Sequence, residues 1–250
     1  MNSSIWSISL GLRRYALDAF LRGNMTNPFI NFTKRDWTLW AFSLAVVTIS
    51  NVFNPRFDLI TFIATIVGAT ALIFAAKGHV ISPILLTVFC ALYGIVSIRF
   101  HYWGELITFV GMCIPLNVMS TISWFRNPSE VAGEVQINRL TKKQKICSGI
   151  LTVVVTIAFY FILSALNTPN IFFSTMSIAT SFAAAAMTIL RSSYYAFWYI
   201  WNDIVCMTLW ILASIKDPVY IPMVVNFGIF FINDIYGFYS WKKREKAMNL

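Results

Sequence analysis

Residues 194–213 read YYAFWYIWNDIVCMTLWILA, a largely apolar stretch of the length that crosses a lipid bilayer. Within it, Trp198-Tyr-Ile-Trp-Asn-Asp203 places two indoles, an amide and a carboxylate close together. Polar and ionisable groups inside a membrane span usually face the interior of a helix bundle or a cavity, and they often mark a substrate pathway. The stretch therefore predicts a membrane-spanning helix that forms the floor of a small-molecule transport site.

The composition of the whole chain indicates a polytopic membrane protein. Hydrophobic residues make up 58% of the 250 residues and charged residues only 12%, whereas a soluble domain is about half apolar and a quarter charged. The net charge of +9 is better explained by anchoring charges on the cytoplasmic side than by nucleic-acid binding. The four cysteines and two histidines show no metal-binding or redox spacing, and we find no catalytic motif, so we expect neither a cofactor nor an enzyme.

Apolar segments of about 20 residues predict an all-α integral membrane protein with about eight transmembrane helices. They lie at roughly 37–53, 57–76, 80–98, 102–124, 146–166, 171–190, 194–214 and 219–241. Residues 1–36 show no signal peptide and are expected to form a cytoplasmic amphipathic helix on the membrane surface, or a flexible tail.

The distribution of basic residues predicts the orientation in the membrane. If the N-terminus is cytoplasmic, 16 Lys and Arg residues lie on the inside and only three, Arg56, Arg99 and Lys216, lie on the outside. This split follows the positive-inside rule and favours an even number of spans. Both termini are therefore expected in the cytoplasm.

A weak internal repeat appears when the sequence is shifted by 117 residues. Ser97-Ile-Arg99 then falls on Ser214-Ile-Lys216, and Ser123-Trp124 falls on Ser240-Trp241. Because one linking span returns the chain to its starting side, the two three-helix repeats would be parallel (3+1+3), a known transporter plan with the substrate between the repeats. The predicted organisation is an N-terminal segment 1–36, an extra helix 37–56, repeat 1 at 57–126, a basic loop and linking helix at 127–170, repeat 2 at 171–243 and a cytoplasmic tail 244–250.

Further polar residues inside the spans are candidates for the site. Asn226 and Asn233 lie two helical turns apart and share a face, and Asp234 maps onto Asn117 in the repeat. For any single asparagine, the alternative is a hydrogen bond between helices. Glu105 lies near the outer edge, where it is either solvated or paired with Arg99.

The tryptophans allow two interpretations. Trp198 and Trp201 are assigned to the site because Asn202 and Asp203 follow them deeper in the span, although an interfacial anchor is the alternative. The aromatic belt at the membrane surface is expected to be formed by other tryptophans at span ends, namely Trp37, Trp40, Trp103, Trp124 and Trp241. Indoles with amides and carboxylates suit a flat, cationic ring that carries a polyol.

The segment 198–203, Asn226 and the ending Ile232-Asn-Asp-Ile-Tyr-Gly-Phe-Tyr-Ser-Trp241 resemble the PnuC family of bacterial nicotinamide riboside transporters. The resemblance covers most of the chain from about residue 37 and is strongest over 194–244. It implies a SWEET-like fold, a homotrimer in the bacterial inner membrane, and facilitated diffusion followed by cytoplasmic phosphorylation that traps the riboside. The resemblance also implies that Trp198, Trp201, Asn202, Asn226 and Asn233 contact the substrate. Asp203, Asp234 and Asn117 are candidate substrate-binding residues because they are polar residues inside the spans, independently of the resemblance.

Three alternatives to riboside transport stay open. Relatives similar to PnuC carry thiamine or riboflavin, and thiamine is also a cationic heteroaromatic. Asp203 and Asp234 are titratable, so transport coupled to protons is possible in chemical terms. A structural membrane protein without transport activity is the third alternative.

Overall fold

The computed structural model describes residues 28–99, 103–131 and 133–248. This part of the chain is helical, and its only β-type pairings are two isolated bridges, His79–Glu134 and Pro128–Val135. The expected all-α membrane architecture is therefore confirmed. The amphipathic helix expected within residues 1–36 falls almost entirely outside the described residues.

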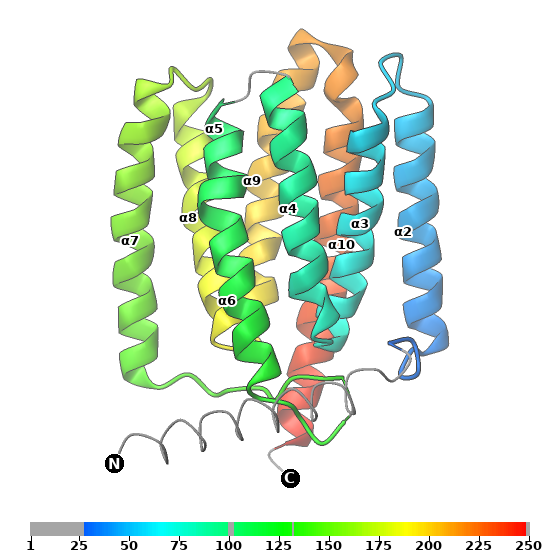
Figure 1. Cartoon of the computed structure of the whole chain (residues 1–250), viewed down its shortest axis with the longest axis vertical. Coiled ribbons are helices and arrows are strands. Elements are labelled where there is room, and N and C mark those ends of the chain that lie inside the picture. Colours follow the sequence, from blue (N-terminus) through cyan, green and yellow to red (C-terminus); the bar gives the residue numbers. More distant parts are fainter. Residues whose placement is uncertain (1–27, 100–102, 132, 249–250) are drawn as a thin grey trace, which may run out of the picture.

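The helices follow the predicted spans closely, with a π-helical stretch η1 and a 3-10 turn η2. In order they are α2 (Lys34–Val52), α3 (Leu59–Lys77), α4 (Ile81–Arg99), α5 (Trp103–Leu106), η1 (Ile107–Cys113), α6 (Ile114–Phe125), α7 (Lys142–Ala165), α8 (Ile171–Ile189), α9 (Tyr195–Lys216), η2 (Pro218–Tyr220) and α10 (Ile221–Ala247). The segments α5, η1 and α6 form one continuous rod (Figure 1).

Seven of these rods are long and apolar enough to cross a membrane. The exception among the predicted spans is α2, although it has 19 residues and runs alongside the bundle (Figure 1). Its first turn carries Lys34, Arg35 and Asp36, which lower its hydropathy. Thr33 and Asp36 form a capping box that starts this helix.

The helices form two groups of three that pack against each other crosswise. Repeat 1 consists of α3, α4 and α5–α6, and repeat 2 consists of α8, α9 and α10, with α7 as the outer linking helix (Figure 1). The third helix of each group packs on the first helix of the other, so that α10 contacts α3 and α6 contacts α8. Two similar halves with reciprocal contacts are the expected 3+1+3 arrangement.

Two tryptophans join the halves by matching hydrogen bonds. The Trp124 indole Nε1 donates to the carbonyl of Thr188 near the end of α8, and Trp241 Nε1 donates to the carbonyl of Ala75 near the end of α3, both at 2.8 Å. Both indoles are fully buried, and their ring centroids are 5.7 Å apart. The expectation that these two tryptophans belong to an interfacial belt was wrong, because the crossed packing brings both span ends together inside the bundle. Trp37 and Trp103, by contrast, are about half exposed.

The first helix of each repeat ends in the same kind of turn. Gly78 and Arg191 adopt left-handed backbone conformations, with φ of 66° and 55°. The next residue in each case donates its N–H to a carbonyl five residues back, as His79 to Phe74 and Ser192 to Met187, each at 2.9 Å. These turns are 113 residues apart, so the 117-residue shift does not hold without a gap along the whole repeat.

The loop between α6 and α7 connects the two turns. The N–H of Val135 donates to the carbonyl of Gly78 at 2.9 Å, and the N–H of Asn138 donates to the carbonyl of Arg191 at 3.0 Å. We call this end of the bundle, which also holds the end of α10, the terminal end, and the opposite end the distal end (Figure 1). The loop therefore joins both repeats at the terminal end.

Replacing Trp124 or Trp241 by Phe removes an indole N–H and with it one of the two hydrogen bonds that the buried carbonyl accepts, the other coming from a backbone N–H. We expect each substitution to lower the free energy of unfolding by about 0.5–1.5 kcal/mol, the net value of one hydrogen bond, measured as a lower unfolding temperature in detergent. Trp201→Phe is the matched control, because this indole is 48% exposed. Equal stability of the Trp241→Phe and Trp201→Phe variants would show that the exchanged hydrogen bonds contribute little.

Candidate functional site

A cavity of about 740 Å³ lies between the two repeats. Helices from both halves line it, and it extends from Tyr199 and Asp234 in the middle of the bundle to exposed Trp103, Asn170 and Lys216 at the distal end. At the terminal end, a packed cluster that includes Trp124, Trp241 and Tyr195 fills the space between the helices. The volume is in the range of small-molecule sites, and the exposed residues of the described lining lie at the distal end.

Four polar side chains meet at the inner end of the cavity. We call them the floor: Asn117, Asn202, Asp203 and Asp234. The carboxyl groups of Asp203 and Asp234 lie within hydrogen-bonding reach of each other, and Asp203 Oδ2 has no partner among the described residues. A hydrogen bond between two carboxyl groups needs a proton on one of them, so the pair can both donate and accept.

The two amides of the floor are positioned by neighbouring helices. Thr180 Oγ1 on α8 donates to Asn202 Oδ1 at 3.0 Å, which leaves the amide N–H groups of Asn202 available. Asn117 Nδ2 lies 3.6 Å from the sulfur of Cys90 on α4. The floor can therefore offer both donors and acceptors to a ligand with several hydroxyl groups.

One wall of the cavity is aromatic. Tyr93 packs against Phe89 and Phe109, with ring centroids 5.3 and 4.6 Å apart, and Phe89 also contacts Phe230 of repeat 2 at 5.9 Å. Toward the distal end, Trp210 packs against Tyr220 at 5.7 Å. Such a wall suits a flat ring, since ring faces stack and attract cations.

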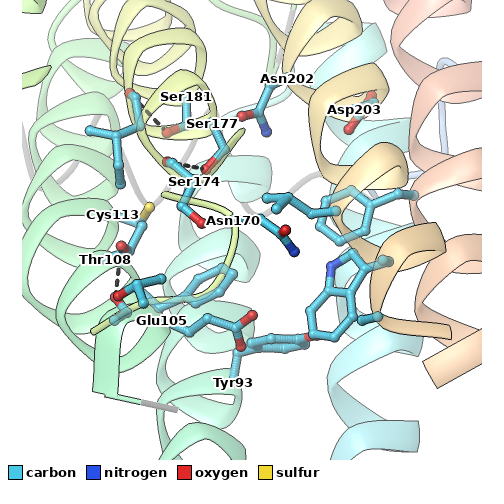
Figure 2. Close-up of a pocket in the computed structure, with 18 of the residues that line it drawn as sticks. Tyr93, Glu105, Thr108, Cys113, Asn170, Ser174, Ser177, Ser181, Asn202 and Asp203 are labelled. Atoms are coloured by element: carbon cyan, nitrogen blue, oxygen red, sulfur yellow. Dashed lines mark hydrogen bonds between the residues drawn. The ribbon is translucent and has the colours of Figure 1, made fainter. Parts of the chain in front are cut away.

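The opposite wall carries hydroxyl groups. Asn170, Ser174, Ser177 and Ser181 follow one face of α8 and its N-cap, and all four point toward the cavity (Figure 2). Each serine hydroxyl donates to a backbone carbonyl close by in sequence, for example Ser177 to Ser174 at 2.8 Å. Their remaining lone pairs are free to accept hydrogen bonds from a ligand.

The rod Trp103–Phe125 changes its winding where it borders the cavity. Residues Ile107–Cys113 are π-helical, and Pro115 follows in the first turn of α6. Proline has no N–H to donate to the preceding turn, and π-helical turns occur frequently at functional sites. Thr108 and Cys113 of this stretch reach the cavity (Figure 2). Pro115 inside a predicted span is a sequence signal that could have indicated this irregularity, although it was not used.

The structure brings half of the predicted site residues together. Asn117, Asn202, Asp203 and Asp234 form the floor, while Trp198 and Trp201 are outside the described cavity lining and are 36% and 48% exposed. For Trp201 the helical period explains this, because it follows Tyr199 by two residues, about 200° around α9, and Tyr199 faces the cavity. The interpretation of these two indoles as interfacial or lipid-facing is favoured by this geometry.

Asn226 and Asn233 also lie away from the cavity lining. Asn233 Nδ2 donates to Ser43 Oγ of α2 at 2.9 Å and to the carbonyl of Ile229 at 2.8 Å. Asn226 is 1% exposed, and neither of its side-chain polar atoms has a partner among the described residues. The geometry of Asn233 corresponds to the alternative of a hydrogen bond between helices.

Several cavity residues were not identified from the sequence. Trp210 lies two helical turns from Asp203 on α9 and faces the same cavity, a spacing that could have pointed to it. The serines of α8 also recur at helical spacing. Tyr93 and Phe109 had no distinguishing pattern, because aromatic residues occur throughout the spans. Among the described residues, no group of three or more His, Cys, Asp or Glu is arranged to hold a metal ion.

Residues 58–243 match the family described as nicotinamide mononucleotide transporter. The chain belongs to this family. It is a family of transporters, which confirms the expected transport function and the resemblance to PnuC, and it argues against an enzyme or a purely structural protein.

Two curated relatives cover nearly the whole chain. The nicotinamide riboside transporter PnuC of Neisseria mucosa is 25% identical over 93% of this chain and 98% of its own length. The protein of the same name from Haemophilus influenzae is 21% identical over 92% and 99%. The crystal structure of the vitamin B3 transporter PnuC is similar in fold, with a TM-score of 0.75 and 22% identity over 87% of this chain and 94% of that one.

The cavity predicts which cysteine is accessible to polar reagents. Cys113 lines the cavity, whereas Cys206 is outside the described lining. In single-cysteine variants, we expect a cationic methanethiosulfonate reagent to modify Cys113 several-fold faster than an anionic one of similar size, because acidic groups in the cavity attract cations. Cys206 should react slowly with both. Equal rates of the two reagents at Cys113 would contradict an acidic, water-accessible cavity.

Proposed function

We propose that this chain carries nicotinamide riboside across the bacterial inner membrane through the cavity between its repeats. Both curated relatives are named nicotinamide riboside transporters, and each is matched over more than nine-tenths of its length. In this proposal the floor residues Asn117, Asn202, Asp203 and Asp234 bind the ribose, and the aromatic wall holds the pyridinium ring with its carboxamide. Trp198, Trp201, Asn226 and Asn233 are left out of the proposed contacts because they lie outside the cavity lining.

The charge of the cavity carries this proposal. Among the described residues, Glu105, Asp203 and Asp234 line it without a basic partner, while Asp217 at the rim is already paired with Arg56 at 3.4 Å. Lys216, also at the rim, is the only basic residue in the described lining. Nicotinamide riboside is a pyridinium cation, which these acidic groups attract. The mononucleotide carries an additional phosphate, which the acidic groups would repel, and the described lining has no Arg or Lys beside the floor to bind it. The cavity therefore favours the riboside over the mononucleotide.

The proposed orientation follows from the basic residues. Lys77, Arg126, Arg191 and the basic end of α10 all belong to the terminal end of the bundle, as the positive-inside rule requires for a cytoplasmic face. Both termini would then be cytoplasmic, and the cavity would be open to the outside. The proposed homotrimer rests on the resemblance to PnuC alone.

We propose facilitated diffusion as the transport mode, with phosphorylation in the cytoplasm keeping the riboside inside. This mode is implied by the resemblance. The Asp203–Asp234 pair is the observation that favours the alternative of proton coupling, because it can hold or release a proton near the substrate. Accumulation of unmodified riboside in proteoliposomes, driven by an imposed pH gradient, would contradict facilitated diffusion.

Calorimetric titration of the purified protein tests the substrate. The ligands are nicotinamide riboside, nicotinamide mononucleotide, thiamine and riboflavin. We expect the riboside to bind at least ten-fold more tightly than the mononucleotide, since the added phosphate faces acidic groups. Preferential binding of thiamine or riboflavin would keep the site and change the substrate, and binding of none of the four would overturn the proposal.

A pair of tryptophan substitutions tests the placement of the site. Trp210→Ala should weaken riboside binding by about ten-fold, because it removes a stacking surface from the cavity. Trp198→Ala should leave the affinity within about two-fold, since this indole lies outside the lining. Unfolding temperatures of both variants serve as the folding control. The reverse order of effects would restore the site first predicted around Trp198.

A further inference from the structure

Glu105 lies at the distal end of the cavity, at the start of the rod Trp103–Phe125. It borders two spaces: the main cavity and a smaller pocket of about 100 Å³ nearer the α2–α3 loop. Tyr93, Trp210 and Tyr220 border the same two spaces. A carboxyl group therefore lies beside aromatic rings at the entrance to the path.

The other acidic groups at this end already have basic partners. Asp58 pairs with Arg99 at 3.3 Å, and Asp217 pairs with Arg56. The sequence-based alternative that Glu105 pairs with Arg99 was therefore wrong, since Asp58 takes that partner. Within the described ranges, Glu105 forms no ion pair.

The hydroxyl group of the neighbouring Tyr93 is also occupied. The carboxyl group of Glu105 lies next to Tyr93 (Figure 2). The Tyr93 hydroxyl, however, donates to the sulfur of Met223 at 3.0 Å. Glu105 is half-buried, and its carboxyl group has no cationic partner in the part of the chain that the structure describes. It borders the same spaces as the paired rings of Tyr93–Phe109 and Trp210–Tyr220. A half-buried carboxylate is stabilised most by a cation, and aromatic faces attract the same charge.

We propose that Glu105, together with Tyr93 and Trp210, is the element that selects for the permanent positive charge of the substrate. This inference rests on the proposed transport of nicotinamide riboside and adds a residue that decides specificity. The pyridinium ring would be recognised at this outer position, two helical turns or about 10 Å along α9 from Asp203. The hydroxyl wall and the floor lie deeper, where the ribose is bound.

The test compares two ligands that differ in charge and little else. Nicotinamide riboside is a cation, and its reduced dihydro form has the same ribose and carboxamide but no charge. Glu105→Gln keeps the shape of the side chain and removes its charge. We expect this variant to bind the cationic riboside about ten-fold more weakly and the dihydro form within about two-fold of the unsubstituted protein.

Asp217→Asn is the matched control. It removes the same charge at the same end of the cavity, but from a residue that is already paired with Arg56. We expect it to change the affinity for either ligand by less than about two-fold. If Glu105→Gln weakens the binding of both ligands equally, the effect is steric and the inference is overturned. If Asp217→Asn weakens the binding of the cationic riboside as much as Glu105→Gln does, the effect is one of net charge and the inference is also overturned.

Failure of the proposed function is distinguishable from failure of this inference. If the unsubstituted protein binds the riboside and Glu105→Gln binds it equally well, only the role of Glu105 is wrong. If the unsubstituted protein does not bind the riboside, the proposed function is wrong. In that case the inference is decided by modification of Cys113, measured as the rate with the cationic methanethiosulfonate reagent divided by the rate with the anionic one. If this ratio falls in the Glu105→Gln variant but not in the Asp217→Asn variant, cation selection at Glu105 is supported. If the ratio is unchanged in Glu105→Gln, the inference is overturned.

Discussion

The exchange of indole hydrogen bonds between the two repeats is the contact on which the rest of the structure depends. Trp124 reaches from repeat 1 to the end of α8, and Trp241 reaches from repeat 2 to the end of α3. The turn that ends each of these helices already gives the same carbonyl a backbone N–H, from Arg191 and from Gly78, so the indole adds a second hydrogen bond that comes from the other repeat. Each indole supplies a donor and a large apolar surface at one point. The exchange therefore holds the repeats together at the terminal end.

Closure at one end determines the shape of the cavity. Because Trp124, Trp241 and Tyr195 fill the space between the repeats at the terminal end, the cavity lies between this cluster and the distal end, where the exposed residues of its described lining are found. The carboxyl groups of Asp203 and Asp234 lie just beyond this packed cluster, 2% and 3% exposed. Ionised carboxylates are costly at such depth unless they share a proton or meet a cation. The fold thus places two neighbouring carboxyl groups at the closed end of the cavity, where we propose that the riboside binds.

The extra helix α2 has a different role from the repeats. It holds its neighbours through polar contacts, such as Asn233 to Ser43 and Lys77 to Asp36 at 3.3 Å, and it does not reach the described cavity lining. Asn233 was predicted as a substrate contact because polar residues in spans are often functional. An asparagine that joins two helices produces the same sequence pattern, since both roles need an inward-facing amide. Only the position of the neighbouring helix distinguishes them.

The sequence by itself determined the membrane class, the approximate bounds of the helices and the repeat. Hydropathy and charge are summed over about 20 residues, so local errors average out. It also identified the floor residues Asn202, Asp203, Asp234 and Asn117, because a polar group deep in a span is rare. The tertiary structure alone decided which face of α9 is inward, so that Trp210 lines the cavity and Trp198 does not. It also decided that Trp124 and Trp241 are buried partners. Both outcomes depend on how helices distant in sequence are rotated and crossed, and no local pattern encodes that rotation when most faces of a helix are apolar.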